Sequence, residues 1–336
     1  MNLSLEQIKA MTLGAVRVER NDHGYNFYRF TEEQQALYKN RSDDFYIKTF
    51  ATSGVQLSFL TNSNTLFLST AVTKGSSRNY FSFDVFVNGN KVDSLSNFDE
   101  ATLHKFYAHD AFPFGEFSKE FSLGDGEKKI EIYFPWSVNA VIKEIKLDDE
   151  SFIKPIKPTK KLLCFGDSIT QGYDTLYPSN KYTTRLAAML DAEEYNKAIG
   201  GEIYFPNLSN TKENFEPDYI SVSYGSNDWN RCSKEEFKHN CKNFFSNLVA
   251  NYPNAKIFAL TPIWRKDMNE VRKFGDFGDT YKIIESETRE YKNITVIKAF
   301  DFVPHDETLF ADARLHPNDK GFKFYFDNLA RYVFNV

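Results

Sequence analysis

The chain of 336 residues has few of the side chains that build disulfide or metal frameworks, with only three cysteines and six histidines. Neither a C-x-x-C nor an H-x-x-x-H pair occurs, so these zinc-ligand spacings are missing. The odd number of cysteines also predicts no disulfide framework. We therefore expect no metal and no other cofactor.

Long apolar runs and basic stripes are missing as well. No run is long enough to span a membrane, and a net charge of −5 argues against a nucleic-acid partner. Met1–Gln7 lacks the basic start and continuous apolar stretch of a signal peptide, and free cysteines suit a reducing compartment. We expect a cytoplasmic protein that binds neither membrane nor nucleic acid. The oligomeric state stays open.

Aromatic residues are plentiful, with 33 phenylalanines and 19 tyrosines. This composition suits a β-rich half of the chain. The length allows two domains with ample core. Residues 154–161 form a proline-punctuated basic stretch that cannot be helical. We expect this linker to separate a domain over 1–153 from a second over 162–336.

Apolar and polar residues alternate along several short runs of the first domain, with the period of half-buried strands. The runs contain Leu57 and Phe59, Leu66 and Leu68, Phe81 to Val87, and Ile130 to Phe134. Turn residues separate them, and the pair Asn88-Gly89 is a strong hairpin signal. The pattern predicts an antiparallel β-sandwich over about 10–150, with the connections of a jelly roll.

After the linker, apolar strands alternate with helical segments. The strands are expected near Leu162, Glu194 and Tyr219, at Lys256–Leu260 and at Ile294–Ile297. This alternation predicts a parallel sheet of about five strands with helices on both faces. The second domain is therefore expected to be a three-layer α/β domain.

Polar residues and glycines follow the ends of these strands. Ser168 stands in the segment Gly166-Asp167-Ser168-Ile169, directly after the first strand. The second strand ends in Gly200-Gly201, the third leads into Asn227, and His316 precedes the last helix. Because open α/β folds build their sites at the carboxyl edge of the sheet, we expect these residues to meet there.

These four segments resemble the conserved blocks of the SGNH hydrolase superfamily, also called the GDSL esterases and lipases. The resemblance covers about Lys160 to Val336 and implies a flavodoxin-like fold and ester hydrolysis. A jelly-roll module ahead of such a domain resembles family 2 carbohydrate esterases, which remove acetyl groups from sugars. We therefore expect a serine esterase that deacetylates a mono- or oligosaccharide.

Ester hydrolysis requires a nucleophile, a base and donors for the oxyanion. Ser168 offers the hydroxyl, and His316 is the candidate base because imidazole titrates near neutral pH. The resemblance implies an oxyanion hole built from the Ser168 amide, the Gly201 amide and the Asn227 side chain. Gly201 rather than Gly200 matches the family spacing, five residues after Asn196.

The segment around His316 departs from the family pattern. The usual aspartate lies three residues before the histidine, but Ala313 stands there and Asp312 lies four before it. Either Asp312 still orients His316, or a backbone carbonyl does so and Ser168 works in a dyad. Ala313 has no side-chain acceptor and is rejected. His305 is a weaker candidate base in a nearby loop.

Three further residues at strand ends are candidate substrate contacts: Asp167, Trp229 and Trp264. Trp136 is expected at the seam between the domains. The polar segment Gly75–Phe81 is noticeable, but the sequence assigns it no role. The catalytic residues do not define the acyl group, so a thioesterase or a lysophospholipase is the main alternative. A non-catalytic carbohydrate-binding protein on the same scaffold is a further one.

Overall fold

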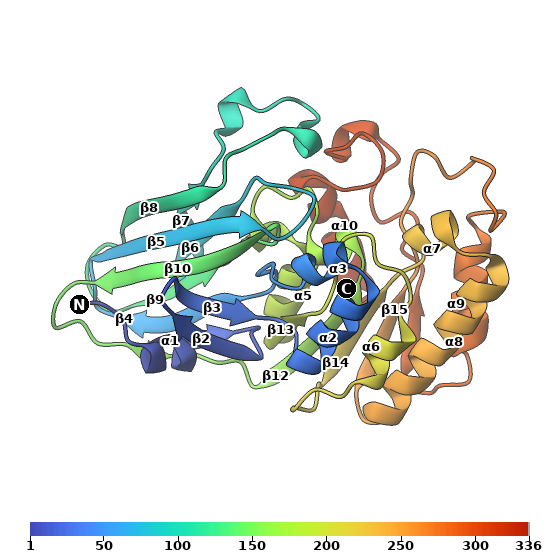
Figure 1. Cartoon of the computed structure of the whole chain (residues 1–336), viewed down its shortest axis with the longest axis horizontal. Helices are drawn as coiled ribbons and strands as arrows, with labels where there is room; N and C mark the ends of the chain where they lie inside the picture. The colour runs from blue at the N-terminus through green and yellow to red at the C-terminus, as the bar shows by residue number, and fades with distance from the viewer. Residues whose placement is uncertain (335–336) are drawn as a thin grey trace.

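In the computed structural model, which describes residues 1–334, two antiparallel sheets form the first part of the chain. They lie on the left in Figure 1 and pack against an α/β part on the right. One sheet has the order β1-β4-β9-β6-β7, with β11 also paired to β4, and the other has the order β2-β3-β10-β5-β8. The strands are β1 (Thr12–Leu13), β2 (Arg17–Asn21), β3 (Gly24–Tyr28), β4 (Gln56–Thr61), β5 (Thr65–Lys74), β6 (Ser82–Val87), β7 (Asn90–Ser96), β8 (Gly115–Ser122), β9 (Lys128–Tyr133), β10 (Val138–Leu147) and β11 (Lys154–Pro155).

The alternating runs of the sequence place one apolar face of each sheet in a common core. Phe59, Phe83 and Ile132 come from one sheet, and Leu68 and Ile142 come from the other. The Asn88-Gly89 pair connects β6 and β7 as predicted, with φ of 50° and 79°. Two positive φ values are typical of the type I′ hairpin turn. The jelly-roll connectivity stays a prediction.

The α/β part contains five parallel strands in the order β13-β12-β14-β15-β16. This confirms the predicted parallel sheet and all five expected strand positions. The strands are β12 (Lys160–Gly166), β13 (Ala192–Asn196), β14 (Tyr219–Ser223), β15 (Lys256–Leu260) and β16 (Ile294–Ile297). The helices are α4 (Ser168–Gln171), α5 (Tyr182–Leu190), α6 (Pro206–Asn210), α7 (Ser226–Arg231), α8 (Lys234–Asn251), α9 (Asp279–Thr288) and α10 (Asp319–Phe334).

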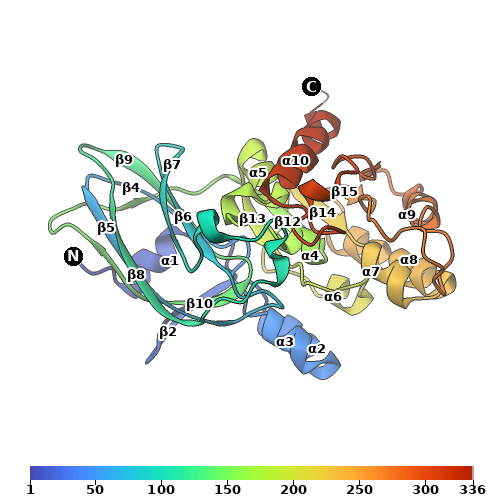
Figure 2. The same ribbon diagram turned by 90° about the horizontal axis from the view of Figure 1, so that it is seen from above.

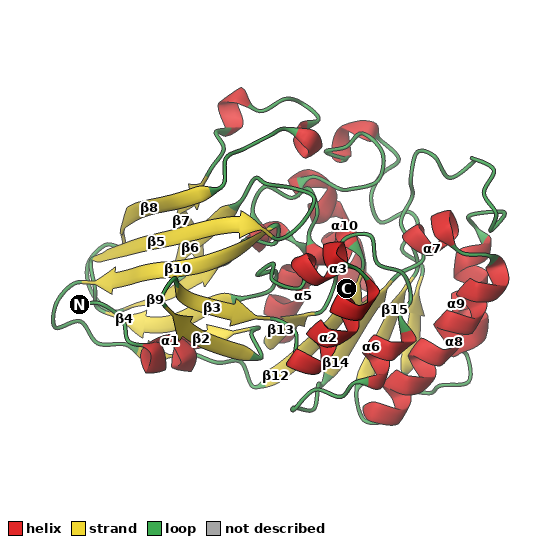
Figure 3. Cartoon of the chain, viewed as in Figure 1, coloured by secondary structure: helices red, strands yellow, loops and turns green. Residues whose placement is uncertain are grey.

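Helices cover both faces of this sheet (Figure 3). Tyr182 of α5 and Phe322 of α10 share one core with Leu162 of β12. Phe237 and Phe244 of α8 contribute to the core of the opposite face. Short helical turns complete the chain: η1 (Glu100–Thr102), η2 (Tyr107–His109), η3 (Pro178–Asn180) and η4 (Glu307–Leu309). No helix within residues 1–334 is long and apolar enough to cross a membrane.

The first 50 residues also differ from the predicted all-β pattern. Besides α1 (Leu5–Met11), they form α2 (Glu32–Arg41) and α3 (Asp43–Lys48). Phe30 and Tyr38 are fully buried in the α/β core rather than between the sandwich sheets. Figure 2 shows α2 and α3 beside the α/β part. The antiparallel sheets predicted over 10–150 are present, but this helical segment interrupts them, and its apolar residues pack on the second half.

Trp136 lies at the seam between the two parts, as predicted. Its indole Nε1 donates to the Thr175 carbonyl at 2.9 Å, and its own carbonyl accepts from Gln171 Nε2 at 2.9 Å. The ring packs on Tyr173 with a centroid distance of 4.8 Å. Tyr173 and Thr175 directly follow α4, so the sandwich contacts the segment next to Ser168.

Candidate active site

Ser168 is the first residue of α4, at the carboxyl end of β12, and only 5% of its surface is exposed. The Asp167 side chain caps this helix by accepting a hydrogen bond from the Ile169 amide at 3.0 Å. The turn depends on Gly166, where a Cβ atom would lie 2.2 Å from Thr170 Oγ1 and 2.8 Å from the Ser223 carbonyl oxygen. The close packing of Gly166 against Thr170 and Ser223 fixes the turn and thereby the position of the Ser168 hydroxyl.

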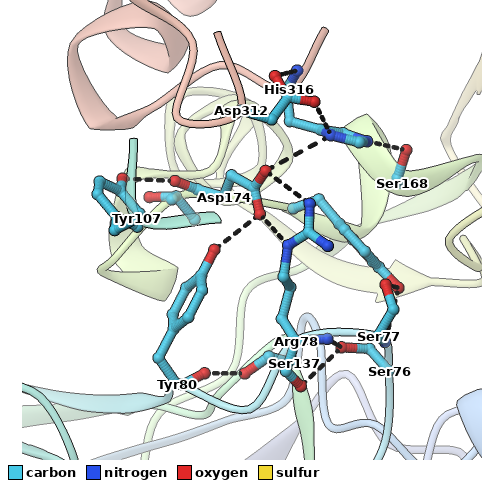
Figure 4. A network of polar contacts seen from close by, with 12 residues as sticks. Ser76, Ser77, Arg78, Tyr80, Tyr107, Ser137, Ser168, Asp174, Asp312 and His316 are labelled. Atoms are coloured by element: carbon cyan, nitrogen blue, oxygen red, sulfur yellow. Dashed lines mark hydrogen bonds and ion pairs between the residues drawn. The ribbon is translucent and has the colours of Figure 1, made fainter. Parts of the chain in front are cut away.

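A chain of hydrogen bonds joins Ser168, His316 and Asp312 (Figure 4). Ser168 Oγ lies 2.8 Å from His316 Nε2, and His316 Nδ1 lies 2.8 Å from Asp312 Oδ2. Asp312 and His316 come from the loop between η4 and α10. The structure thus brings together the predicted serine and histidine, and the histidine contacts the aspartate that lies four residues before it.

The environment of Asp312 favours its ionised form. Its Oδ1 accepts hydrogen bonds from the backbone amides of Arg314, Leu315 and His316 at 2.9, 2.8 and 3.1 Å. Burial alone would raise the pKa of this carboxyl, but the His316 ring and the amides hold the pKa well below its usual range. A carboxylate therefore faces the imidazole at neutral pH.

Two predicted oxyanion donors follow strand ends, Gly201 in the turn after β13 and Asn227 at the start of α7 after β14. Gly201 follows β13 and has φ of +86°, a conformation that favours glycine. The amide of Gly200 is already bonded to Gln171 Oε1 at 2.7 Å, whereas that of Gly201 has no acceptor within residues 1–334. Asn227 Nδ2 donates to the Glu202 carbonyl at 3.0 Å and lies 3.4 Å from Asp167 Oδ2.

Buried carboxyls surround these donors. Burial raises the pKa of Asp167 to about 6 and that of Asp228 to about 7. Asp228 accepts the amides of Tyr204 and Gly225 at 3.0 Å each, and thereby fixes the start of α7 that carries Asn227. Asp167 is 97% buried, and its predicted contact with substrate stays a prediction.

The prediction of a substrate contact at Trp229 is wrong for this structure. The side chain is fully buried, and its Nε1 donates to the Gly275 carbonyl at 2.9 Å. Its ring packs edge-on against Phe277 with centroids 5.3 Å apart. Trp229 follows a strand end but lies on the inward side of α7, where it fills the core.

Trp264 is partly exposed, and one face of its ring stacks on His305 with a centroid distance of 5.1 Å. Its proposed contact with substrate stays a prediction. His305 Nε2 lies 3.1 Å from Asp301 Oδ1. It is therefore His316, and not His305, that contacts Ser168.

Four residues that the sequence did not single out form a polar cluster next to His316 (Figure 4). Asp174 Oδ2 is 3.5 Å from His316 Nδ1. Arg78, Tyr80 and Tyr107 reach Asp174 from the sandwich part. The only hint in the sequence was the polar segment Gly75–Phe81, which contains Arg78 and Tyr80. Their partner Asp174 lies 96 residues after Arg78, so no local pattern connects them.

Asp174, Asp312 and His316 are the one described group that offers clustered metal-ligand atoms, which lie within 4.8 Å of one another. A cation there would compete with the Arg78 guanidinium, which already binds both carboxylate oxygens of Asp174. It would also have to displace the proton that His316 Nδ1 shares with Asp312. The cluster fits an imidazole held by carboxylates better than it fits a metal centre.

Comparison with known proteins agrees with this geometry. Residues 164–324 match the GDSL-like Lipase/Acylhydrolase family, and this range contains Ser168, Gly201, Asn227 and His316. No curated protein matches the whole sequence significantly.

Solved structures are similar over nearly the whole chain. A salicylyl-acyltransferase of a tetracycline biosynthetic pathway has a TM-score of 0.78 at 17% identity, covering 96% of this chain and 93% of its own. A family two carbohydrate esterase from Clostridium thermocellum, in complex with cellohexaose, has a TM-score of 0.66 at 14% identity, with 96% and 98% covered. An acetyl xylan esterase from the rumen bacterium Butyrivibrio proteoclasticus has 0.62 at 15% identity, with 100% and 98% covered.

At such identities these likenesses establish the fold, including the antiparallel sheets ahead of the α/β part. The family match covers the part of the chain in which the strand ends bring serine, glycine, asparagine and histidine together. The similarity to the GDSL-like lipase/acylhydrolase family thus extends over residues 164–324.

Proposed function

We propose that this protein is a serine esterase that removes acetyl groups from an acetylated mono- or oligosaccharide through an acyl-enzyme on Ser168. The observation that carries the proposal is the hydrogen-bond chain from Ser168 Oγ through His316 to Asp312, with two contacts of 2.8 Å. This arrangement is that of an activated nucleophile, a base and an orienting carboxylate. One solved structure of similar fold is named a family two carbohydrate esterase and another an acetyl xylan esterase, which supports the substrate class.

The reaction begins with proton transfer. His316 Nε2 takes the proton of Ser168 as its oxygen attacks the ester carbonyl carbon, and Asp312 stabilises the imidazolium that forms. Collapse of the tetrahedral intermediate breaks the bond to the sugar oxygen, which receives the proton from His316. Water then attacks the acetyl-enzyme by the same base catalysis and releases acetate and free Ser168.

The negative charge of the tetrahedral intermediate requires donors. In this proposal they are the amides of Ser168 and Gly201 and the side-chain amide of Asn227. Asn227 Nδ2 donates to the Glu202 carbonyl at 3.0 Å and to Asp167 Oδ2 at 3.4 Å, so the hydrogen of the longer bond would turn from Asp167 to the oxyanion. Loss of one such donor typically costs about 3–4 kcal/mol of transition-state stabilisation.

A thioesterase or lysophospholipase would use the same catalytic residues but would need room for a longer acyl chain. A pocket of about 1020 Å³ is lined by Pro262, Phe277, Tyr281 and Phe302 among others. Neither Ser168 nor His316 lines this pocket, so it supplies no acyl groove at the nucleophile. A non-catalytic sugar-binding role does not account for the hydrogen bond between Ser168 and His316.

We also propose that the protein is located in the cytoplasm. Cys164, Cys232 and Cys241 are all free and buried, which agrees with a reducing compartment such as the cytoplasm. Addition of a reductant should then leave the melting temperature unchanged. A fall in melting temperature would argue against free cysteines in the native protein.

The substrate class is tested with a panel of acetylated sugars, with released acetate as the readout, and with p-nitrophenyl acetate against the palmitate ester. We expect acetate release and a strong preference for the acetyl ester. A fluorophosphonate should label Ser168 in the wild type and not in Ser168→Ala. Preference for palmitate would shift the proposal to a lipase-type enzyme, and labelling of Ser168→Ala would overturn the assigned nucleophile.

A further inference from the structure

Asp174 is a second carboxylate beside the candidate catalytic histidine. Its side chain is fully buried, and its Oδ2 lies 3.5 Å from His316 Nδ1, the same ring nitrogen that contacts Asp312. Asp174 belongs to the turn that follows α4. An isolated buried carboxylate at this place would be costly, so its partners decide what it does.

Those partners come from the sandwich part (Figure 4). Arg78 binds Asp174 with two hydrogen bonds, from Nε to Oδ1 at 2.7 Å and from Nη2 to Oδ2 at 3.0 Å. Tyr80 donates its hydroxyl hydrogen to Oδ1 at 2.7 Å. Tyr107 donates to the Asp174 backbone carbonyl, also at 2.7 Å. The sandwich thus fixes both the carboxylate and the backbone of Asp174.

The backbone of Asp174 adopts a conformation that residues other than glycine disfavour. Its φ is +72°, in the left-handed region that non-glycine residues rarely adopt. Such a conformation costs on the order of 1 kcal/mol or more and persists when surrounding contacts determine it. Here it directs the carboxylate toward both Arg78 and His316.

We propose that Asp174 and Arg78 form a positioning pair for His316, so that the sandwich part contributes to the catalytic centre. This inference rests on the proposed esterase function, in which His316 is the base. Asp174 is the second acceptor that faces Nδ1 and keeps the ring plane turned toward Ser168. Arg78 holds the Asp174 carboxylate in place and balances its charge.

The charge balance has a chemical reason. The titratable or charged groups around His316 are Asp312, Asp174, Asp167, Arg78, Tyr80 and Tyr173. Two uncompensated carboxylates at Nδ1 would hold the imidazole protonated, and a protonated imidazole cannot accept the serine proton. The guanidinium of Arg78 offsets the second carboxylate. Burial would lower the pKa of Arg78, but Asp174 outweighs burial and raises it, so this cation is permanent.

The test uses two substitutions that remove opposite charges from the pair. In Asp174→Asn the Arg78 cation is left uncompensated, and the midpoint of the acidic limb of the kcat/KM profile should fall by about one pH unit. In Arg78→Met the carboxylate is left uncompensated, and the midpoint should rise by a similar amount. Arg78→Lys keeps the charge and should leave the midpoint close to that of the wild type.

Asp84→Asn is the matched control. Asp84 is also a fully buried carboxylate of the sandwich and also reaches the α/β part, since it accepts from Ser179 Oγ at 2.6 Å. Its substitution should lower the melting temperature without moving the pH profile. Shifts of Asp174→Asn and Arg78→Met in the same direction, or no larger than those of Asp84→Asn, would overturn the inference and reduce the pair to an interface contact.

A second readout does not require turnover. The imidazole signals of His316 can be followed by NMR as a function of pH in the wild type and in each variant, including the milder Arg78→Lys. The same opposite shifts are expected there, and their absence would also overturn the inference. If no ester is hydrolysed and Ser168 is not labelled, the proposed function fails, but the NMR titration still decides whether Asp174 and Arg78 act on His316.

Discussion

Asp312 Oδ2 and His316 Nδ1 are 2.8 Å apart although three residues separate them in the sequence. Ala313, which occupies the usual family position of the aspartate, adopts a φ of +55°. This left-handed residue absorbs the extra length, because it reverses the chain locally and lets the carboxylate face back toward the ring. The Asp312 side chain then also accepts three amides of the same loop.

If Asp312 orients His316 during catalysis, Asp312→Asn should lower kcat by about two to four orders of magnitude with little change in KM. The asparagine amide would face Nδ1 with a donor and favour the wrong tautomer. Steady-state kinetics on an acetyl ester measure the effect, with Asp306→Asn as control. Asp306 is exposed in the same region, and its side chain caps η4. A loss below tenfold in folded Asp312→Asn would instead favour a Ser168–His316 dyad.

His316→Ala should reduce activity as severely as Ser168→Ala, because members of one catalytic unit fail together rather than additively. His305→Ala should retain most activity, since its ring stacks on Trp264 and pairs with Asp301. Rates of the three variants on p-nitrophenyl acetate, with folding checked by circular dichroism, compare them directly. An exchange of behaviour between the two histidines would show that the base is misassigned.

A chain that begins at Lys160 should be insoluble or largely unfolded. It loses Phe30 and Tyr38 from the α/β core. Burial of each such side chain contributes about 1.5–3 kcal/mol to the free energy of unfolding. It also loses Arg29, which is fully buried and donates to the Asn196 and Ala198 carbonyls at 2.5 and 3.2 Å, just before Gly201. Gel filtration and circular dichroism of the truncated chain test this. A folded and fully active truncation would contradict the idea that the sandwich supports the site.

Asp167 should make the wild type less stable as the pH rises. Its ordinary pKa is 3.8, and burial raises the pKa to about 6 in the folded chain. The favourable contribution of Asp167 to the free energy of unfolding is therefore complete below about pH 4. It is lost as the pH rises through about 6, and the loss amounts to at most about 3 kcal/mol.

Asp167→Asn keeps an oxygen for the Ile169 amide but removes the titration. The difference in unfolding free energy between this variant and the wild type should therefore grow in favour of the variant from pH 4 to pH 7. Urea denaturation at several pH values measures it. Asp228 titrates in both proteins, but loss of the Asp167 charge makes the pKa of Asp228 less raised in the variant, which adds to the difference in the same direction. A difference that is independent of pH would refute the role of Asp167 burial.

Local patterns in the sequence were sufficient for the strands and the Ser168 turn, because they depend on periodicity and on residues adjacent in the chain. The same patterns could not place Trp229, since a tryptophan after a strand end can face either the core or the solvent. Asp174 and Arg78 lie 96 residues apart, and neither has a local signature for the other. Likewise, nothing within 30–48 indicates that its apolar side chains pack on a sheet formed much later in the chain.

The burial of α2 and α3 also has a consequence for synthesis on the ribosome. Arg29 contacts a backbone carbonyl 167 residues further along the chain, and Lys48 contacts one 152 residues further. The side of segment 29–48 that carries Phe30 and Tyr38 therefore stays uncovered until β13 and its following loop have been made. During that interval Phe30 and Tyr38 are open to chaperones and to aggregation. Slow translation between residues 50 and 200 should lower the soluble yield more than equal slowing after residue 250.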